Sequence, residues 1–310
     1  MTSEVFLSLL PVVLLIAFGM YLRNRRFLEE GFWPQAEKLG YYVLLPSLFF
    51  HGLATANLGS LPVGDLALTL IVSTIAVAGL VIVVRPLLKV DGPAFTSVFQ
   101  GSVRFNNYVG VTLAGGLFGA EGIALAAICN AAIVPTVNIL CVLVFAKHGT
   151  ARLSGRGIII KQLVTNPLVL ASLGGIVFQL LGLGIPPGVE ASMRSLGAAS
   201  LPLGLLCVGA ALDFKAARHW IGPVASSSAM KFLTMPAATV IVASVVGLEG
   251  RALTTALLFQ ALPTASSAYI MARQLGGDAP LMAGITATQT VLALGAIPLI
   301  LIGLAQWVVI

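Results

Sequence analysis

The sequence predicts an all-α integral membrane protein with ten transmembrane helices, arranged as two inverted repeats of five helices each. Three observations lead to this prediction. The chain is 58% hydrophobic and only 9% charged, with a mean hydropathy of +1.02, and no soluble domain exposes so little charge. Its apolar residues fall into ten stretches of about 20 residues, the length that crosses a bilayer. Two of these stretches, about half a chain apart, carry similar interruptions.

The ten predicted spans follow one another with short connections. They lie near residues 5–22, 37–56, 64–86, 94–118, 122–146, 163–184, 195–212, 221–247, 251–274 and 279–308. Spans four and five are separated only by Gly119–Glu121, so the turn between them is expected to be tight. Residues 1–146 form the first repeat, 147–162 a short basic cytoplasmic linker, and 163–310 the second repeat. Because each repeat has five spans, an odd number, the second enters the membrane in the opposite sense to the first.

Spans four and nine carry the clearest sign of an internal duplication. Phe99-Gln100 in span four corresponds to Phe259-Gln260 in span nine, at an offset of about 160 residues. Further along, the polar stretch 104–107 of span four corresponds to the proline-bearing stretch 262–265 of span nine. Interruptions in matching spans of two repeats are typical of secondary transporters, in which the opened backbone lines a substrate cavity. We therefore expect helices four and nine to be broken.

The basic residues predict how the chain is oriented. If the N-terminus lies outside, thirteen of the 17 lysines and arginines face the cytoplasm, two face out and two lie within spans. Short cytoplasmic loops are enriched in Lys and Arg, so we expect both termini outside. Basic residues scattered over loops form no patch for nucleic acid. A small single unit without a targeting extension is expected in a bacterial cytoplasmic (inner) membrane.

Two cations, Arg104 and Lys231, are predicted to lie about ten residues inside spans four and eight. A charge at that depth costs at least about 2.5–3.5 kcal/mol and needs a partner. All 11 acidic residues map to loops or span ends, so an anionic substrate is the simplest partner. In the alternative interpretation, Arg104 donates to the carbonyl groups of its own broken helix and Lys231 extends toward the cytoplasmic end of its span.

Further candidates for substrate binding surround the two interruptions. Asn106 and Asn107 can cap a half-helix or hydrogen-bond a carboxylate, and Pro263 blocks helix continuation at the equivalent point. Thr264, Ser266 and Ser267 follow with hydroxyl groups. Half-helices that begin here would direct their positive dipole ends toward the membrane midplane, which favours an anion. A simple proline kink would explain span nine alone.

Other polar residues of the spans are candidates for ion coupling or, alternatively, for hydrogen bonds between helices. They are Gln100, Asn130, Asn138, Gln260, Gln289 and Thr290. His51 in span two is a candidate for relaying a proton, with a buried structural role as the alternative. The three cysteines lie in apolar spans, so neither a disulfide framework nor a metal site is expected. The chain also lacks the motifs of hydrolases, metalloproteases and nucleotide-binding enzymes, and we expect no enzymatic activity.

The chain resembles the auxin efflux carrier family, whose members include plant auxin exporters and bacterial malonate-type carriers. The resemblance rests on residues 104–110 in span four, Lys231 with Pro236 in span eight, and residues 262–265 in span nine. It implies the fold of the bile acid–sodium symporters and an elevator-type mechanism. Spans one, two, six and seven would form a scaffold, often as a homodimer, and spans three to five and eight to ten a transport domain. Spans four and nine would cross at their breaks, where the substrate would bind near Asn107 and Pro263.

The sequence departs from the family pattern in three places. Asn106-Asn107 stand where plant members have a proline, so the break in span four is expected to be gentler. The short linker 147–162 replaces the long cytoplasmic loop of many plant members. Gln260 stands near the position of the carboxylate that binds sodium in the bile-acid-type relatives, which argues against sodium coupling.

The expected function is therefore a secondary transporter of a small organic anion, either a dicarboxylate such as malonate or an auxin-like aromatic carboxylate. The alternatives are a carrier of a neutral or cationic solute and a passive anion channel, because the same donors are suited to line a pore. The expected partners are the anion, the lipid bilayer and a second copy of the chain. We expect no cofactor and no nucleic acid.

Overall fold

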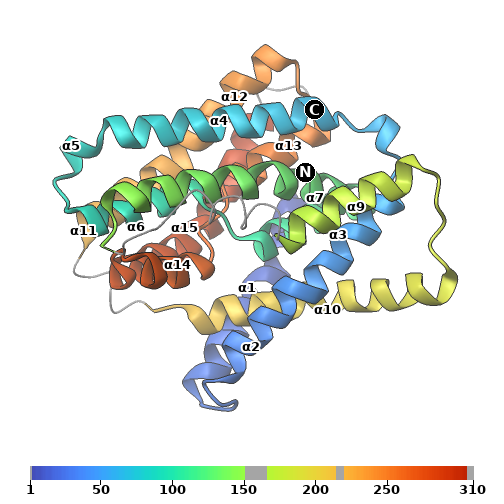
Figure 1. Ribbon diagram of the computed structural model, residues 1–310, viewed down its shortest axis with the longest axis horizontal. Helices are drawn as coiled ribbons and strands as arrows, with labels where there is room; N and C mark the ends of the chain where they lie inside the picture. Colours follow the sequence, from blue (N-terminus) through green and yellow to red (C-terminus); the bar gives the residue numbers. More distant parts are fainter. Residues whose placement is uncertain (1, 151–165, 214–219, 306–310) are drawn as a thin grey trace. The chain divides into compact units, whose positions relative to one another are not determined.

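The computed structural model describes residues 2–150, 166–213 and 220–305 (Figure 1). Every regular element within these residues is a helix, as the sequence predicts. The chain divides into two compact units. Unit 1 consists of residues 1–64, 107–131 and 163–211. Unit 2 consists of residues 65–106, 132–162 and 212–310.

Six stretches of the described residues are long and apolar enough to cross a membrane. They are Leu7–Asn24, Val63–Val83, Gly92–His148, Pro187–Ala211, Ile221–Val246 and Ala279–Gly303. The third of them covers 57 residues, more than twice the about 20 that one crossing needs. Large apolar side chains on several of these helices are exposed, among them Leu14 and Phe18. An apolar exterior of this kind suits lipid and is expected of an integral membrane protein.

Within the described residues, unit 1 contains seven complete helices, the first part of α7 and the first two residues of α4 (Val63–Val83). The complete helices are α1 (Thr2–Asn24), α2 (Phe32–Leu39), the π-helix η1 (Gly40–Leu44), α3 (Leu45–Ala54), the 3₁₀-helix η2 (Leu58–Ser60), α9 (Pro167–Leu180) and α10 (Pro187–Ala211). Helix α7 (Asn107–His148) contributes its residues up to 131. Helix α10 packs against α1 and α3, and α3 also packs against α9.

Helix α10 begins at Pro187, earlier than the predicted span 195–212. A proline is well placed in the first turn of a helix, where its missing N–H would have no intrahelical partner. The early start places Glu190 and Arg194 on the helix rather than in a loop. The predicted boundary was wrong because these two charged residues lower the hydropathy of the first two turns.

Glycines bring the backbones of α1 and α10 into contact. A Cβ atom added at Gly19 would overlap the carbonyl oxygen of Leu206, and one added at Gly209 would overlap that of Ile16. In both cases the neighbouring group is backbone, so it has no rotamer by which to move away. Small residues at helix contacts are the usual means by which membrane helices pack closely.

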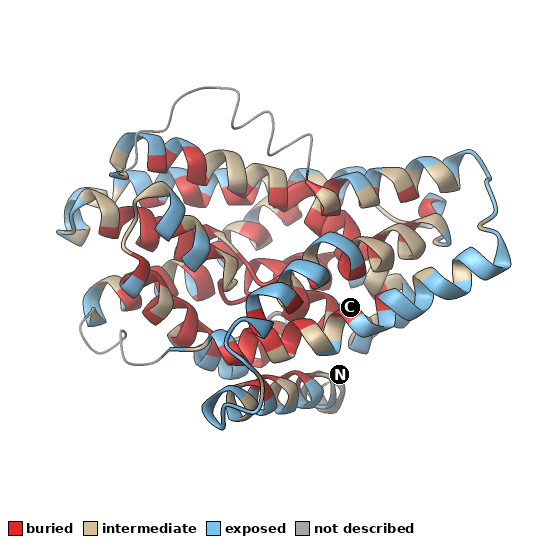
Figure 2. Ribbon diagram, turned by 60° about the horizontal axis from the view of Figure 1, so that its bottom comes forward, coloured by how far each residue is buried: buried red, intermediate tan, exposed pale blue. Residues whose placement is uncertain are grey.

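Among the described residues, unit 2 contains the second part of α7 and nine further helices, the first of which enters the unit at residue 65. They are α4 (Val63–Val83), α5 (Arg85–Leu88), α6 (Gly92–Val103), α11 (Ile221–Ala229), the π-helix η4 (Met230–Thr234), α12 (Met235–Val246), α13 (Gly250–Gln260), α14 (Ser267–Leu275) and α15 (Ala279–Ala305). Helix α6 packs against α11, α14 and α15, and α13 packs against α12 and α15. Almost every residue of α6 and α13 is buried, whereas α1 has many exposed positions. In Figure 2 the exposed positions of α1 appear in pale blue on the helix beside the N-terminus.

Both interruptions expected from the sequence are present in the backbone. Helix α6 ends at Val103 and α7 begins at Asn107, which leaves residues 104–106 outside any helix. Helix α13 ends at Gln260 and α14 begins at Ser267, which leaves residues 261–266 between them. The first interruption is the shorter of the two, in keeping with the absence of a proline there.

The expected tight turn between spans four and five lies at Gly119, where φ is 59° and ψ is −135°. Glycine adopts this backbone conformation at no steric cost, and the turn divides α7 into two parts. Helix is therefore found within each of the ten predicted spans, whereas the number of membrane crossings and their inverted order stay predictions. Of the predicted linker, residues 151–162 lie outside the described residues.

Most of the predicted spans lie entirely in one of the two units. Spans one, two, six and seven fall in unit 1, and spans three, eight, nine and ten fall in unit 2. Spans four and five are divided between the units, after residues 106 and 131. This division is one of packing, and the assignment of a scaffold and a transport domain stays a prediction.

Candidate functional site

Lys231 is the most unusual residue of unit 2. Its side chain is 0% exposed, and its Nζ atom makes no hydrogen bond with any residue that the structure describes. It lies in the π-helical turn η4, just before Pro236. Proline lacks the N–H of a regular helical hydrogen bond, and widened turns of this kind are frequent at functional sites. The side chain is enclosed by protein, as expected of a site residue, whereas an extended side chain at the end of its span would reach solvent.

Arg104 lies at the end of α6, in the first interruption, and binds side chains of two other helices of unit 2. Its Nη1 atom donates to Asn138 Oδ1 of α7 at 2.8 Å and lies 3.6 Å from Met271 Sδ of α14. Its Nη2 atom donates to Ser267 Oγ at 3.5 Å. These partners orient the guanidinium but carry no charge, so its positive charge is not neutralised by them.

Cys141 of α7 lies in the neighbourhood of both cations. Its buried thiol is within electrostatic range of Arg104 and of Lys231. Asn138, the partner of Arg104, is three residues earlier and therefore on the same face of α7. Arg104 and Lys231 therefore both lie near this part of α7 in unit 2.

Sequence reasoning weighed Asn138 and Ser267 among the polar residues of spans five and nine, but it did not connect them with Arg104 and did not select Cys141. All three are small polar residues in or beside an apolar span, and such residues are common at helix contacts. The one available signal was the pairing of Asn138 and Cys141 at a spacing that puts both on one helix face.

The interruption at residues 261–266 is fixed by Gln289 of α15. Gln289 Oε1 accepts hydrogen bonds from Thr264 N at 3.0 Å and Thr264 Oγ1 at 2.7 Å. Gln289 Nε2 donates to Gly101 O at 2.9 Å and to Ser227 Oγ at 3.2 Å. Both ends of the amide are therefore used within unit 2. Gln289 and Thr264 hold the break in place, which is the structural role weighed for Gln289 from the sequence.

Gln260 joins the end of α13 to α4. Its Nε2 atom lies 2.9 Å from Ser73 Oγ, 3.0 Å from Thr74 Oγ1 and 3.2 Å from Leu70 O. All three neighbours are oxygen atoms that accept hydrogen bonds, so the amide nitrogen lies among three oxygen atoms of α4. The interaction is a set of hydrogen bonds between helices.

The remaining candidates of unit 2 line or flank the breaks. Asn106 and Pro263 are buried, and Ser266 is half-buried immediately before α14. Gln100 Nε2 donates to Ala268 O at 3.4 Å, a long hydrogen bond.

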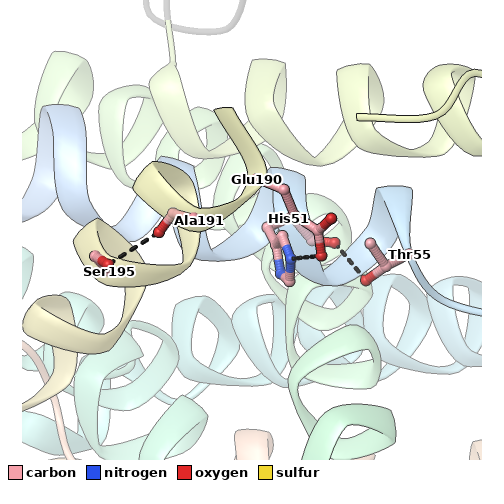
Figure 3. A network of polar contacts seen from close by, with 5 residues as sticks. All are labelled: His51, Thr55, Glu190, Ala191 and Ser195. Carbon is pink, nitrogen blue, oxygen red and sulfur yellow. Dashed lines mark hydrogen bonds and ion pairs between the residues drawn. The ribbon is translucent and has the colours of Figure 1, made fainter. Parts of the chain in front are cut away.

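Three candidates belong to unit 1. Asn107 is the first residue of α7. Asn130 is buried in the same helix and donates to Ala126 O one turn earlier. His51 of α3 has its Nε2 atom 3.4 Å from Glu190 Oε1 of α10 (Figure 3).

Comparisons with known proteins find similarity to membrane transporters. A family model described as "Membrane transport protein" matches residues 153–301. An uncharacterized transporter of Methanothermobacter thermautotrophicus is 24% identical over 297 residues, which cover 94% of this chain and 96% of that protein. An uncharacterized transporter of Methanocaldococcus jannaschii is 22% identical over 274 residues, which cover 84% and 86% of the two chains. With its long apolar helices, this chain is an integral membrane transporter that is similar to these transporters over most of its length.

Proposed function

We propose that this chain is a secondary carrier of a small organic anion. The observation that carries the proposal is Lys231, a fully buried cation whose Nζ atom has no hydrogen-bond acceptor among the described residues. A buried charge is strongly disfavoured unless it is paired. A carboxylate of the substrate would supply the missing negative charge, and the affinity would come largely from this compensation.

Arg104 would bind a second carboxylate. Its guanidinium is held by the neutral side chains of Asn138 and Ser267, and a guanidinium matches the two oxygens of a carboxylate. Two cations beside one thiol, that of Cys141, suit a compact dicarboxylate such as malonate. This reasoning supports a malonate-carrier-like member of the family.

An aromatic carboxylate, of the auxin type, is the second candidate. It is favoured by the ring pair of Phe105 and Phe259, whose centroids are 5.8 Å apart. Phe105 follows Arg104 directly, so an aromatic substrate would stack beside the cation that binds its carboxylate.

We further propose ten membrane crossings in two inverted repeats, with both termini outside and an elevator-type movement of one group of helices past another. The breaks at matching places in spans four and nine support the repeat. The division of the chain into two compact units is what an elevator requires. A homodimer in a bacterial inner membrane is proposed on the family resemblance alone.

Counterflow in proteoliposomes tests the anion carrier. Labelled malonate and indole-3-acetate are offered separately to the wild type, to Arg104→Ala and to Lys231→Met, with the exposed Lys38→Met as the matched control. Saturable exchange of one anion is expected in the wild type and the control, and its loss in the two site variants.

Two results would contradict the proposal. Unchanged exchange in Lys231→Met would show that transport does not need the positive charge on which the proposal rests. Flux that never saturates, accompanied by unitary currents in planar bilayers, would identify an anion channel in place of a carrier.

A further inference from the structure

A cavity of about 600 Å³ lies within unit 1. It is formed by α3 and the segment after it, by α7 around the turn near residue 120, and by the beginning of α10. Its lining is mostly apolar and includes Leu48, Ile123, Met193 and Leu201. Sites for small molecules typically have volumes of about 300–1,000 Å³ and an apolar lining with a few polar groups. The cavity therefore has the size and the composition of a ligand site.

One cation in the cavity wall is left unpaired. Glu190 precedes Arg194 by four residues on α10, a spacing that favours an ion pair along a helix. The carboxylate of Glu190 instead lies 3.4 Å from His51 Nε2 (Figure 3). Arg194 makes no hydrogen bond or ion pair within the part of the chain that the structure describes. Its guanidinium is thus available to a ligand at the edge of an apolar cavity.

A second charged residue of the wall, Glu121, differs from Arg194 in this respect. It lines the cavity from α7 and interacts with another residue of the protein. Its negative charge nevertheless opposes an anion in the cavity through the Coulomb interaction. Removing the charge of Arg194 should therefore lower the affinity of the cavity for an anion, and removing the charge of Glu121 should raise it.

We propose that this cavity is a second ligand site, separate from Arg104 and Lys231, and that it binds an amphipathic monocarboxylate. The carboxylate accepts charge-assisted hydrogen bonds from Arg194. The hydrocarbon body of the ligand lies against Leu48, Ile123 and Leu201, where its burial adds favourable free energy. The basic-residue pattern predicts that the three segments around the cavity all reach the outer side of the membrane. A ligand would thus enter this site from outside the cell.

Isothermal titration in nanodiscs of zwitterionic lipid tests the site with octanoate as the probe and uncharged octanamide as its counterpart. Empty nanodiscs correct for partition into lipid. Arg194→Gln removes the cation, and Ala198→Trp fills the cavity with a large side chain. Arg273→Gln, an exposed arginine on α14, is the matched control. Arg104→Ala separates this site from the proposed transport site.

Saturable binding of octanoate is expected, about tenfold weaker or more in Arg194→Gln and lost in Ala198→Trp, but unchanged in Arg273→Gln and Arg104→Ala. Glu121→Gln is expected to bind octanoate more tightly. Equal binding of octanamide, or unchanged affinity in Arg194→Gln, would overturn the proposal. Binding that disappears in Arg104→Ala but persists in Arg194→Gln would also overturn it and assign the anion to the transport site alone.

Discussion

Thr264 and Gln289 are joined by two hydrogen bonds that end on one atom, since Gln289 Oε1 accepts from both the backbone nitrogen and the hydroxyl of Thr264. A broken helix leaves backbone groups without their usual partners, and inside a membrane no water replaces them. The amide of Gln289 supplies the acceptor for the break and donates its own N–H groups to Gly101 and Ser227. One side chain thus links α15 to the break, to α6 and to α11.

Replacing Gln289 by Leu should destabilise unit 2. The substitution leaves the buried Thr264 N–H without an acceptor and the Gly101 carbonyl with only the Thr264 hydroxyl as a donor, which we expect to lower the free energy of unfolding by about 1–3 kcal/mol. Denaturant unfolding in detergent micelles measures the change. Gln35→Leu on the exposed side of α2 is the control and should lie within about 0.5 kcal/mol of the wild type. Equal stability of the two variants would show that the network contributes little.

Gly209→Ala should weaken the packing of α1 against α10 and destabilise the protein. The added methyl group would overlap the carbonyl oxygen of Ile16, and overpacking of this kind costs about 1–3 kcal/mol. A lower melting temperature in a thermal unfolding experiment is expected. Gly295→Ala on α15 is the control, because nothing lies within 4 Å of its added Cβ. There the higher helix propensity of alanine should leave the melting temperature equal or slightly raised. A melting temperature of Gly209→Ala that matches this control would contradict the close contact.

Lys231→Met should raise the stability of the protein and abolish transport. Methionine keeps the length of the side chain and removes an unpaired buried charge, so the empty protein is expected to be more stable by about 1–3 kcal/mol. Stabilisation by malonate and malonate exchange should both disappear. Thermal unfolding with and without malonate, together with counterflow, measures these effects. A variant that loses stability as well as exchange would instead indicate that Lys231 holds the fold together.

Asn138→Asp should weaken anion binding without unfolding the protein. The new carboxylate keeps the hydrogen bond to Arg104 and adds the negative charge that the substrate otherwise supplies. We expect the apparent KM for malonate to rise about tenfold, equivalent to about 1.4 kcal/mol. Gln35→Glu on the exposed side of α2 adds the same charge elsewhere and should leave the KM unchanged. An unaltered KM in Asn138→Asp would mean that Arg104 does not face the anion.

The helices and their breaks were predictable from the sequence because local chemistry decides them. Length and hydropathy set the spans, Pro263 and the polar stretch 104–107 mark the interruptions, and Gly119 marks the turn. Lys231 and Arg104 stood out because an ionised side chain inside an apolar span is costly wherever the chain folds. These inferences need no knowledge of which helix packs on which.

The partners of these residues were not predictable for the opposite reason. Gln260 meets Ser73 across 187 residues of sequence, and Gln289 meets Thr264 across 25. Apolar helices offer many alternative contacts of similar free energy, so hydropathy alone does not select the pairs. The contact of His51 with Glu190 was missed because the charged first turns of α10 were taken for a loop.

Transport should not require sodium, and Gln260 gives the reason. Its Nε2 atom occupies a position among three oxygen atoms of α4, at 2.9–3.2 Å, and hydrogen-bonds them as a donor, so no cation is needed there. Malonate exchange should therefore proceed equally in sodium and in choline buffers at a clamped membrane potential. In Gln260→Glu a carboxylate would face the same oxygens, and it would need a bound cation or a proton to be accommodated. That variant should be destabilised in choline at neutral pH and regain stability when sodium is added or the pH is lowered. Exchange by the wild type that stops in choline would contradict this role of Gln260 and place a sodium site elsewhere in the protein.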